Sequence, residues 1–423
     1  TEGLPQGDMG RIGLDIYRGN PDWVYAVVQA DASGDNDGVD EDGVYRSWDR
    51  GETWEQVGTE NPRPMYYSQI RVDPNDPERV YLGGADFYMS QDGGEEFTDE
   101  AAEEVHLDHH AIWINPADSD HIIMGGDGGV SVTFDRSENW RQLRNLPVSQ
   151  FYEVGVDMRR PYHVCGGLQD NGSWCAPSDT WGRQGIRDKH WTNIGGGDGF
   201  FTELHPNGRL MFAESQGGNL VRVDVIALER QFGVRPEAFD ENGESIPLRR
   251  NWNTPILMSE HDDDRIYYGA NMLFRSDDLG SSWERISDDL TFAIDRDELE
   301  IMGVPGSAPQ MSRNDGQSTY GNLVSIAESP LDENVLYTGA DDGRLMGTQD
   351  GGTTWTDLTD NVPGLPANTY VTRLIASHAA AGTISAAFDG HRSDDFAAYV
   401  YRSDDYGASW RLITNGLPAN SVS

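Results

Sequence analysis

The hydrophobic residues of this chain fall into short runs, about four to eight residues long, that are bounded by Gly, Asp, Asn and Pro. Val80-Tyr81-Leu82 and Ile122-Ile123-Met124 are typical runs. Their length and their turn-forming borders predict β-strands joined by tight hairpins. The segment from Val225 to Phe232 is the exception, and its pattern predicts a helix. No run reaches the roughly 18 apolar residues that a membrane-spanning helix requires. The pattern as a whole therefore predicts an all-β fold.

A second pattern repeats along the chain, Ser/Thr-x-Asp-x-Gly-x-Ser/Thr-Trp, which we call the Asp-box motif. Four complete copies contain Asp49, Asp278, Asp350 and Asp405, and two degraded copies contain Asp92 and Asp135. Such an aspartate can accept hydrogen bonds from the backbone of its own turn. The glycine supplies a positive φ, and the aromatic residue packs the outer strand onto the sheet. We therefore interpret these aspartates as structural.

The repeats organise the whole chain into one architecture. Their period of about 40–50 residues is typical of a β-propeller with four-stranded antiparallel blades. Eight blades are counted, starting near Arg11, Tyr66, Ala111, Gln150, Phe200, Thr254, Asn322 and Tyr370. Segments 224–252 and 290–319 interrupt the period and are predicted insertions. We expect residues 1–423 to form one propeller of seven or eight blades with Asp-box turns.

Charge narrows the range of partners. The chain has 72 acidic and 31 basic residues, a net charge of -41, and its only lysine is Lys189. A surface this acidic repels phosphate backbones, so a nucleic-acid partner is not expected. Acid excess with almost no lysine points to a halophilic or marine source, because salt screens self-repulsion. A GC-rich genome that encodes Arg in place of Lys explains the missing lysine equally well.

The two cysteines, Cys165 and Cys175, flank a segment that reads as strand, turn, strand. If the turn centres on Asp170, the cysteines face each other across an antiparallel pair, where a disulfide fits. A disulfide would imply an oxidising compartment, so we expect a secreted, periplasmic or cell-surface location. The alternative is a pair of small buried thiols.

In a propeller, function usually gathers on the face formed by the loops that enter each first strand and leave each second strand. Candidate catalytic carboxylates in these loops are Asp108, Asp127, Asp170, Asp198 and Asp394. Candidate ligand-binding residues are His106, His109, His110, Tyr66, Tyr67, Gln150, Asn171, Tyr320, Tyr370 and His391. For any single aspartate in a Gly-rich turn, ordinary turn formation is the alternative interpretation.

Two segments raise the question of a metal. Strand alternation puts His106, Asp108 and His110 on one side and His109 on the other, and such a set could hold a divalent metal or relay protons. No further Cys or His stands at a familiar ligand spacing. An acidic loop with Asp35, Asp37, Asp40 and Asp42 offers oxygen ligands for Ca²⁺. A solvated acidic loop is the alternative there.

At the Asp-box motifs the chain resembles the bacterial-neuraminidase-repeat proteins. These include sialidases, xyloglucanase-type glycoside hydrolases and sortilin-type receptors. The likeness is closest to secreted bacterial proteins described as sortilin-like or glycosyl-hydrolase-like. It is carried by segments 10–14, 106–116, 126–129, 169–171, 273–276 and 391–396. The resemblance implies a propeller that is the middle of a longer multi-propeller chain. The arginine triad and tyrosine nucleophile of sialidases are not recognisable, so the resemblance assigns no catalytic residue.

Three functions follow from these observations. The first is an extracytoplasmic, sortilin-like scaffold that binds a peptide, a protein or a glycan through its channel-side face. The second is a glycoside hydrolase in which two of the candidate aspartates flank a polysaccharide. The third is a structural component of a cell-surface assembly. A fold of this kind hosts many functions, so only the site can separate these alternatives.

Overall fold

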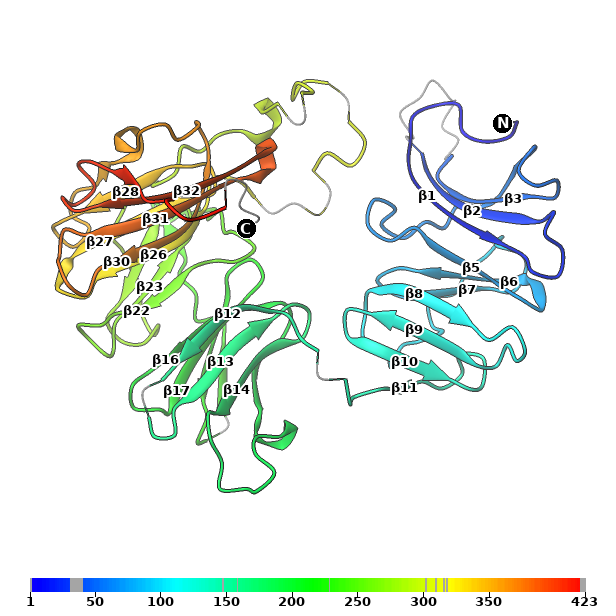
Figure 1. The fold of residues 1–423 in the computed structure, drawn as a ribbon, viewed down its shortest axis with the longest axis horizontal. Coiled ribbons are helices and arrows are strands. Elements are labelled where there is room, and N and C mark those ends of the chain that lie inside the picture. Colours follow the sequence, from blue (N-terminus) through cyan, green and yellow to red (C-terminus); the bar gives the residue numbers. More distant parts are fainter. Residues whose placement is uncertain are drawn as a thin grey trace. The chain divides into compact units, whose positions relative to one another are not determined.

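The computed structural model describes residues 2–30, 41–146, 148–157, 159–227, 229–300, 303–308, 310–314, 316 and 319–418. These residues form two compact units, which we describe separately (Figure 1). Unit 1 is Thr1–Val148 with Gln310–Gly316, and unit 2 is Ser149–Pro309 with Gln317–Ser423. Within the described residues, the regular structure is almost entirely antiparallel β-sheet.

Unit 1 contains three sheets in which consecutive strands pair in order. The strands are β1 (Met9–Ile16), β2 (Val24–Ala30), β3 (Gly43–Ser47) and β4 (Glu55–Gly58); β5 (Gln69–Asp73), β6 (Asp76–Gly83) and β7 (Phe87–Ser90); and β8 (His109–Ile114), β9 (Ile122–Gly126), β10 (Gly129–Thr133) and β11 (Arg141–Gln142).

Unit 2 contains five four-stranded sheets of the same kind and one small hairpin. The sheets are β12 (Phe151–Val156), β13 (His163–Leu168), β14 (Gly172–Pro177) and β15 (Thr192–Gly195); β16 (Gly199–Leu204), β17 (Leu210–Ser215), β18 (Asn219–Asp224) and β19 (Glu229–Phe232); β22 (Ile256–Met258), β23 (Ile266–Gly269), β24 (Leu273–Ser276) and β25 (Glu284–Arg285); β26 (Leu323–Ser329), β27 (Asp332–Ala340), β28 (Leu345–Thr348) and β29 (Thr356–Asp357); and β30 (Tyr370–Ala376), β31 (Ile384–Gly390), β32 (Asp395–Ser403) and β33 (Arg411–Leu412). The hairpin is β20 (Ala238–Phe239) with β21 (Ser245–Ile246), and short 3₁₀ turns are η1 (Asp188–His190), η2 (Arg296–Glu298), η3 (Thr359–Asn361) and η4 (His391–Ser393).

Successive sheets are arranged as blades. In each unit the first strand of one sheet lies beside the first strand of the next, as β12, β16, β22, β26 and β30 do in unit 2. Up-and-down sheets joined through adjacent inner strands define a β-propeller. The chain is therefore an all-β propeller fold, as predicted. The number of blades around one axis stays a prediction, and so does the assignment of 1–423 to a single domain.

The apolar core lies between neighbouring blades. One cluster joins Tyr25 and Val27 of β2 to Ile70 of β5 and Leu82 of β6, and all four are buried. Each blade thus covers one face of the next. This explains why apolar residues occur in short runs along the strands. Burial of a large side chain in such a cluster contributes roughly 1.5–3 kcal/mol.

The Asp-box turns are held by their own side chains. In the turn of β24, Asp278 accepts hydrogen bonds from Ser276 Oγ (2.8 Å), Ser282 N (2.7 Å) and Ser282 Oγ (2.6 Å). These bonds to the charged form lower the pKa of Asp278, the hydroxyl of Ser282 first. The next turn along follows the same pattern around Asp350, and Trp355 Nε1 donates to Ile286 O of the preceding blade at 3.1 Å. The motif thus closes a hairpin, and Trp355 also ties two blades together.

Replacing Asp278 by Ala should lower the free energy of unfolding by about 1 kcal/mol, because three acceptor contacts of a solvent-accessible turn are lost. Urea unfolding followed by tryptophan fluorescence measures the change. Asp277→Ala is the neighbouring control, since Asp277 forms only ion pairs with Arg265 and Arg275. Equal losses in the two variants would contradict a special role for the motif.

The prediction of a helix from Val225 to Phe232 is wrong. Glu229–Phe232 is strand β19, and it pairs with β18 through Val221↔Phe232 and Arg222↔Gln231. Hydrogen bonding to the free edge of β18 favours a strand here, and this effect is stronger than the local preference of the segment for a helix. Among the described residues, no helix has the length and apolarity needed to cross a membrane.

Cys165 and Cys175 lie directly opposite each other in the β13–β14 pair, and the structure contains a disulfide between them. Both residues are buried in a cluster with Ile194 and Met211. The hairpin that carries the Asp170 turn is therefore cross-linked close to its middle.

Candidate functional site

The loops of unit 1 bring several of the predicted residues together. Tyr67 precedes β5, Asp108 precedes β8, and Asp127 lies in the turn between β9 and β10. Asp108 adopts a positive φ of 70°, and its carbonyl oxygen accepts a hydrogen bond from Asp127 N at 3.1 Å. Gly126 allows this approach, because a Cβ there would lie 2.4 Å from Asp108 O. The backbone thus fixes both aspartates.

We call Tyr66, Tyr67, Asp108, His110 and Asp127 the aromatic–carboxylate cluster. Its rings lie 4.9 Å (Tyr66–Tyr67), 5.2 Å (Tyr66–His110) and 5.1 Å (Tyr67–His110) apart, measured between centroids. The Tyr67 hydroxyl donates to Asp108, and His110 Nε2 lies 3.2 Å from Asp127 Oδ1. Tyr67 is buried, whereas 36% of Tyr66 is exposed. Tyr66 is therefore the partly exposed ring of the cluster, and the Arg63 guanidinium lies 4.6 Å from its centroid.

The two carboxylates of the cluster lie close together. A carboxylate oxygen of Asp108 and one of Asp127 are within 4.8 Å of each other. Such a pair can accept hydroxyl hydrogen bonds from a sugar, and with His110 it could also hold a divalent cation. Burial, and then the contact with Asp108, raises the pKa of Tyr67. Tyr67 therefore stays a neutral donor to Asp108.

The alternation does not extend to His106, because His106 precedes β8 and lines the same hollow as His109. His109 is only 2% exposed and lies against Phe87, with ring centroids 5.9 Å apart. Burial lowers the pKa of His109 to about 4, so its imidazole is neutral at ordinary pH. His106 is exposed and its Nδ1 lies 2.9 Å from Leu107 O. His110 is therefore the histidine that contacts the carboxylate pair.

In unit 2, four of the predicted residues, Gln150, Asp170, Asn171 and Asp198, lie in or contact the β13–β14 turn. Asp198 is buried, and its Oδ1 accepts a hydrogen bond from Asp170 N at 3.0 Å. Gln150 O accepts from Gln169 N at 3.0 Å, and Asn171 Nδ2 donates to Gln169 O at 2.9 Å. These contacts brace the β13–β14 turn and give Asp198 a supporting role.

The loops near Tyr320 surround a buried carboxylate pair that was not among the predicted site residues. Asp341 accepts from Gly321 N (2.9 Å), Asn322 N (2.8 Å) and Asn322 Nδ2 (2.9 Å). Burial, and then the charge of Asp341, raises the pKa of Asp342 to about 6. The neighbouring backbone and amide donors fill the acceptor positions of Asp341, so this pair organises the loop.

Three predicted residues lie in the last blade, and the charge of Asp341 is felt by one of them, Tyr370. Tyr370 is half-buried, and the guanidinium of Arg392 lies 4.5 Å from its ring centroid. Burial raises the pKa of Tyr370 to about 12. His391 Nδ1 contacts Asp389, and Asp394 is exposed with a positive φ of 58°. A ligand at this loop would therefore meet the guanidinium of Arg392 and the ring of Tyr370, and not a pair of carboxylates.

The Ca²⁺ prediction lies mostly outside the described residues, because Asp35, Asp37 and Asp40 belong to the segment 31–40. Asp42 is described, and its Oδ2 accepts a hydrogen bond from Ala30 N at 3.2 Å. The calcium site therefore remains a prediction.

A hollow of about 390 Å³ lies among the inner strands of unit 2. Glu153 of β12 and Arg373 of β30 form an ion pair there (Oε1–Nη2, 2.6 Å). Burial, with a further contribution from the charge of Glu153, raises the pKa of Glu203 to about 8. This feature has no sequence signal, since its residues meet only after the five inner strands are assembled.

Glu203 should make the stability depend on pH. The unfolded carboxyl loses its proton near pH 4.5 and the folded one near pH 8, so its contribution is present below about pH 4.5 and is lost as pH rises to about 8. Between pH 5 and pH 9, the free energy of unfolding of Glu203→Gln should rise by about 1–2 kcal/mol relative to that of the wild type. This is less than the pKa shift alone would give, because solvent enters the hollow. Thermal unfolding across this range measures the gain. Glu229→Gln, an exposed strand position, should show none, and parallel pH profiles of wild type and Glu203→Gln would refute the assignment.

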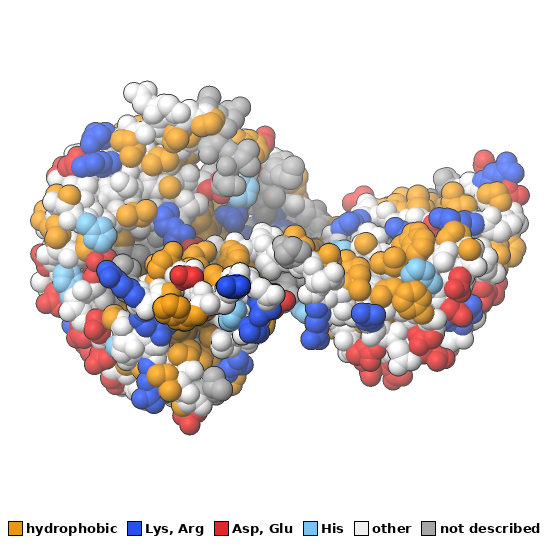
Figure 2. Space-filling model, turned by 60° about the horizontal axis from the view of Figure 1, so that its bottom comes forward, with side chains coloured by type: hydrophobic (Ala, Val, Ile, Leu, Met, Phe, Trp, Pro, Cys, Tyr) orange, Lys and Arg blue, Asp and Glu red, His pale blue; other side chains and the backbone are white. Residues whose placement is uncertain are grey.

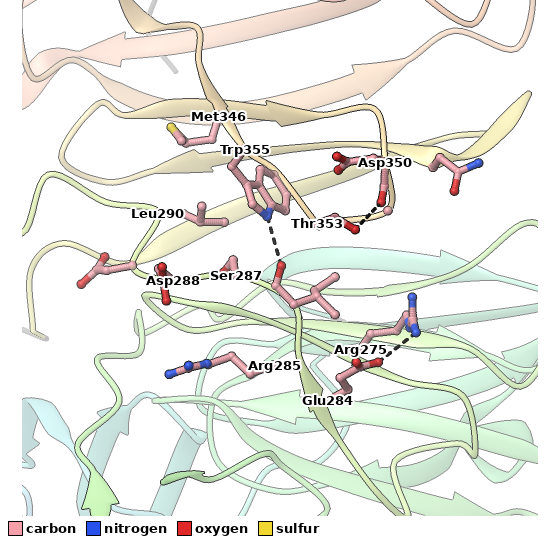
Figure 3. A pocket seen from close by; sticks show the side chains of 15 residues that line it. Arg275, Glu284, Arg285, Ser287, Asp288, Leu290, Met346, Asp350, Thr353 and Trp355 are labelled. Atoms are coloured by element: carbon pink, nitrogen blue, oxygen red, sulfur yellow. Dashed lines mark hydrogen bonds and ion pairs between the residues drawn. The ribbon is translucent and has the colours of Figure 1, made fainter. Parts of the chain in front are cut away.

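A second hollow, of about 730 Å³, opens at the rim between the β22–β25 and β26–β29 blades (Figure 3). Two of the contacts between its lining residues are Arg275 Nη2 to Glu284 Oε2 at 2.9 Å and Thr353 Oγ1 to Asp350 O at 3.0 Å, with the arginine and the threonine as donors. We interpret it as the crevice left where two blades diverge outward.

Comparison with known proteins gives distant likenesses. No family model matches. A curated relative, the oligoxyloglucan-reducing end-specific xyloglucanase of Emericella nidulans, is 28% identical over 103 residues, which are 21% of this chain and 13% of that protein. A GH74 enzyme of Niastella koreensis is 14% identical, with 96% of this chain and 65% of that chain covered and a TM-score of 0.28. Sqt1 from Chaetomium thermophilum is 13% identical, with 83% of each chain covered and a TM-score of 0.40. The chain thus spans less than two thirds of the length of the first proteins it resembles, and xyloglucan-acting enzymes are among them.

Proposed function

We propose that this chain is an extracytoplasmic binding scaffold that takes a glycan at the aromatic–carboxylate cluster. The observation that carries the proposal is the partly exposed ring of Tyr66 in one cluster with the carboxylates of Asp108 and Asp127, which His110 connects. A sugar presents an apolar ring face, which an aromatic side chain can cover, and hydroxyl groups, which carboxylates accept. Tyr67 and His110 orient the two carboxylates before a ligand arrives, so little ordering is needed on binding.

Two further observations support the location and the class of ligand. The disulfide between Cys165 and Cys175 fits an oxidising compartment outside the cytoplasm. The name of the Emericella relative directs the first probe to xyloglucan oligosaccharides. The sortilin-like function, binding of a peptide or protein by the same face, is the outcome that would replace the glycan.

Calorimetric titration with xyloglucan oligosaccharides tests the proposal. Tyr66→Ala and Asp127→Asn should each weaken binding at least about tenfold, a loss of about 1.4 kcal/mol. Phe232→Ala and Asp263→Asn are matched controls, because both residues are exposed and lie on other elements. Unchanged binding in Tyr66→Ala would exclude this site, and binding of peptides without glycans would exclude the ligand class.

A glycoside hydrolase is the second candidate, favoured by the short distance within the carboxylate pair. Retaining enzymes place their two carboxyl groups about 5–5.5 Å apart, and inverting enzymes about 6.5–9.5 Å apart. The pair of Asp108 and Asp127 is closer to the retaining arrangement. Release of reducing ends from xyloglucan that is lost in Asp108→Asn would establish hydrolysis, and binding without release would leave the scaffold function.

A further inference from the structure

The loop between β14 and β15 differs from the corresponding turn of most other blades. Residues 178–191 replace the Asp-box turn by a long excursion that contains η1 and extends away from its sheet (Figure 1). Positions 181–189 form an uninterrupted run of exposed residues. We call residues 178–191 the basic loop, for the reason given next.

The basic loop reverses the charge of the protein locally. It holds Arg183, Arg187 and Lys189, the only lysine of the chain, against Asp179 and Asp188. Acidic residues outnumber basic ones by 72 to 31 in the whole sequence, so partners for a cation are plentiful. Arg265, for example, contacts both Asp277 and Glu333. None of the three loop cations forms an ion pair with any residue that the structure describes. Their charge is therefore available to a ligand.

An aromatic ring accompanies these cations. Trp181 is fully exposed, and it lines a surface hollow of about 700 Å³ together with Arg183, Arg187, Lys189 and His190. Figure 2 turns this end of unit 2 toward the viewer and shows basic side chains among hydrophobic ones on that face. A tryptophan left in solvent beside unpaired cations is typical of a binding surface rather than of a structural turn.

Internal hydrogen bonds give the loop a defined shape. Gly182 N donates to Thr180 Oγ1 at 2.9 Å, and Gly185 N to Gly182 O at 3.0 Å. Arg187 N donates to His190 Nδ1 at 2.9 Å, which holds the start of η1. The loop thus presents its ring and its cations with part of the ordering already in place, and this reduces the entropy lost on binding.

We propose that the basic loop binds an anionic polysaccharide, with Trp181 covering a sugar ring and Arg183, Arg187 and Lys189 pairing with its carboxylate or sulfate groups. Guanidinium groups match such oxyanions with paired hydrogen bonds. A membrane or a duplex would bring an extended negative surface against a protein of net charge -41, which is unfavourable. A single flexible polyanion can touch the loop alone. The proposal goes beyond the glycan site of unit 1, since it uses other residues and requires a charged ligand.

Affinity measurements with dextran sulfate, polygalacturonate and uncharged dextran test the proposal on the full chain. The two polyanions should bind and dextran should not, and 1 M salt should weaken binding at least tenfold because it screens the charges. Arg183→Gln/Arg187→Gln/Lys189→Gln and Trp181→Ala should each weaken polyanion binding at least tenfold. Binding of only one polyanion identifies sulfate or carboxylate as the preferred group and supports the proposal.

The matched control is Arg18→Gln/Arg141→Gln/Arg285→Gln, which removes three exposed cations elsewhere and should change the affinity less than twofold. Circular dichroism and xyloglucan binding should be unchanged in all variants, which separates this proposal from that of unit 1. Equal effects of the two triple variants would overturn the proposal. Equal binding of uncharged dextran, preferential binding of anionic vesicles, or loss of self-association in the loop variants would also overturn it.

Discussion

Replacing Gly167 by Ala is expected to lower the free energy of unfolding by about 3 kcal/mol or more. Gly167 lies in β13, and a Cβ at this position would stand 2.0 Å from the carbonyl carbon of Gly199 and 2.2 Å from Phe200 N. Both atoms belong to the backbone of β16, the inner strand of the next blade. No flexible side chain can move aside, so the two blades must separate to admit one methyl group.

Gly196→Ala provides the control for this prediction. Gly196 lies shortly before Gly199 in the sequence, has no positive φ, and no atom lies within 4 Å of its Cβ position. Alanine there should change the stability by less than about 0.5 kcal/mol. Urea unfolding of both variants measures the difference. A Gly167→Ala protein as stable as the wild type would show that β13 and β16 are not in close contact.

The all-β class could be predicted from the sequence because its determinants are local. Short alternating runs specify strands, and residues within one turn, such as Ser276, Asp278 and Ser282, make the hairpin bonds. The segment Val225 to Phe232 shows the limit of local reasoning. Its composition favours a helix, whereas its pairing with β18 decides the structure.

Side-chain partners in the candidate site could not be predicted, because they are distant in sequence. Tyr67 and Asp108 are 41 positions apart, and they meet only when the second and third sheets of unit 1 are adjacent. Glu153 and Arg373 are 220 positions apart in one hollow. The sequence indicated which loops hold polar residues, but whether a given aspartate faces a partner, a turn or solvent depends on how the blades are assembled.

Replacing both cysteines by Ala is expected to lower the free energy of unfolding by about 2–3 kcal/mol, because the disulfide restricts a loop of the unfolded chain. Cys165 and Cys175 are separated by 10 positions, which places the entropic contribution near the lower end of the usual range. Both sulfur atoms are buried among Ile194, Met211 and their neighbours. Alanine also leaves a small cavity in this cluster, which adds to the loss.

Reduction separates the cross-link from the packing. In the wild type, dithiothreitol should lower the unfolding midpoint in urea toward that of the double Ala variant, whereas the variant itself should not respond. The difference in unfolding midpoint that remains between the reduced wild type and the variant reports the stability lost through the cavity alone. Two titratable thiols in unreduced, denatured protein would show that the cysteines are buried thiols, and would remove the disulfide as support for an oxidising compartment.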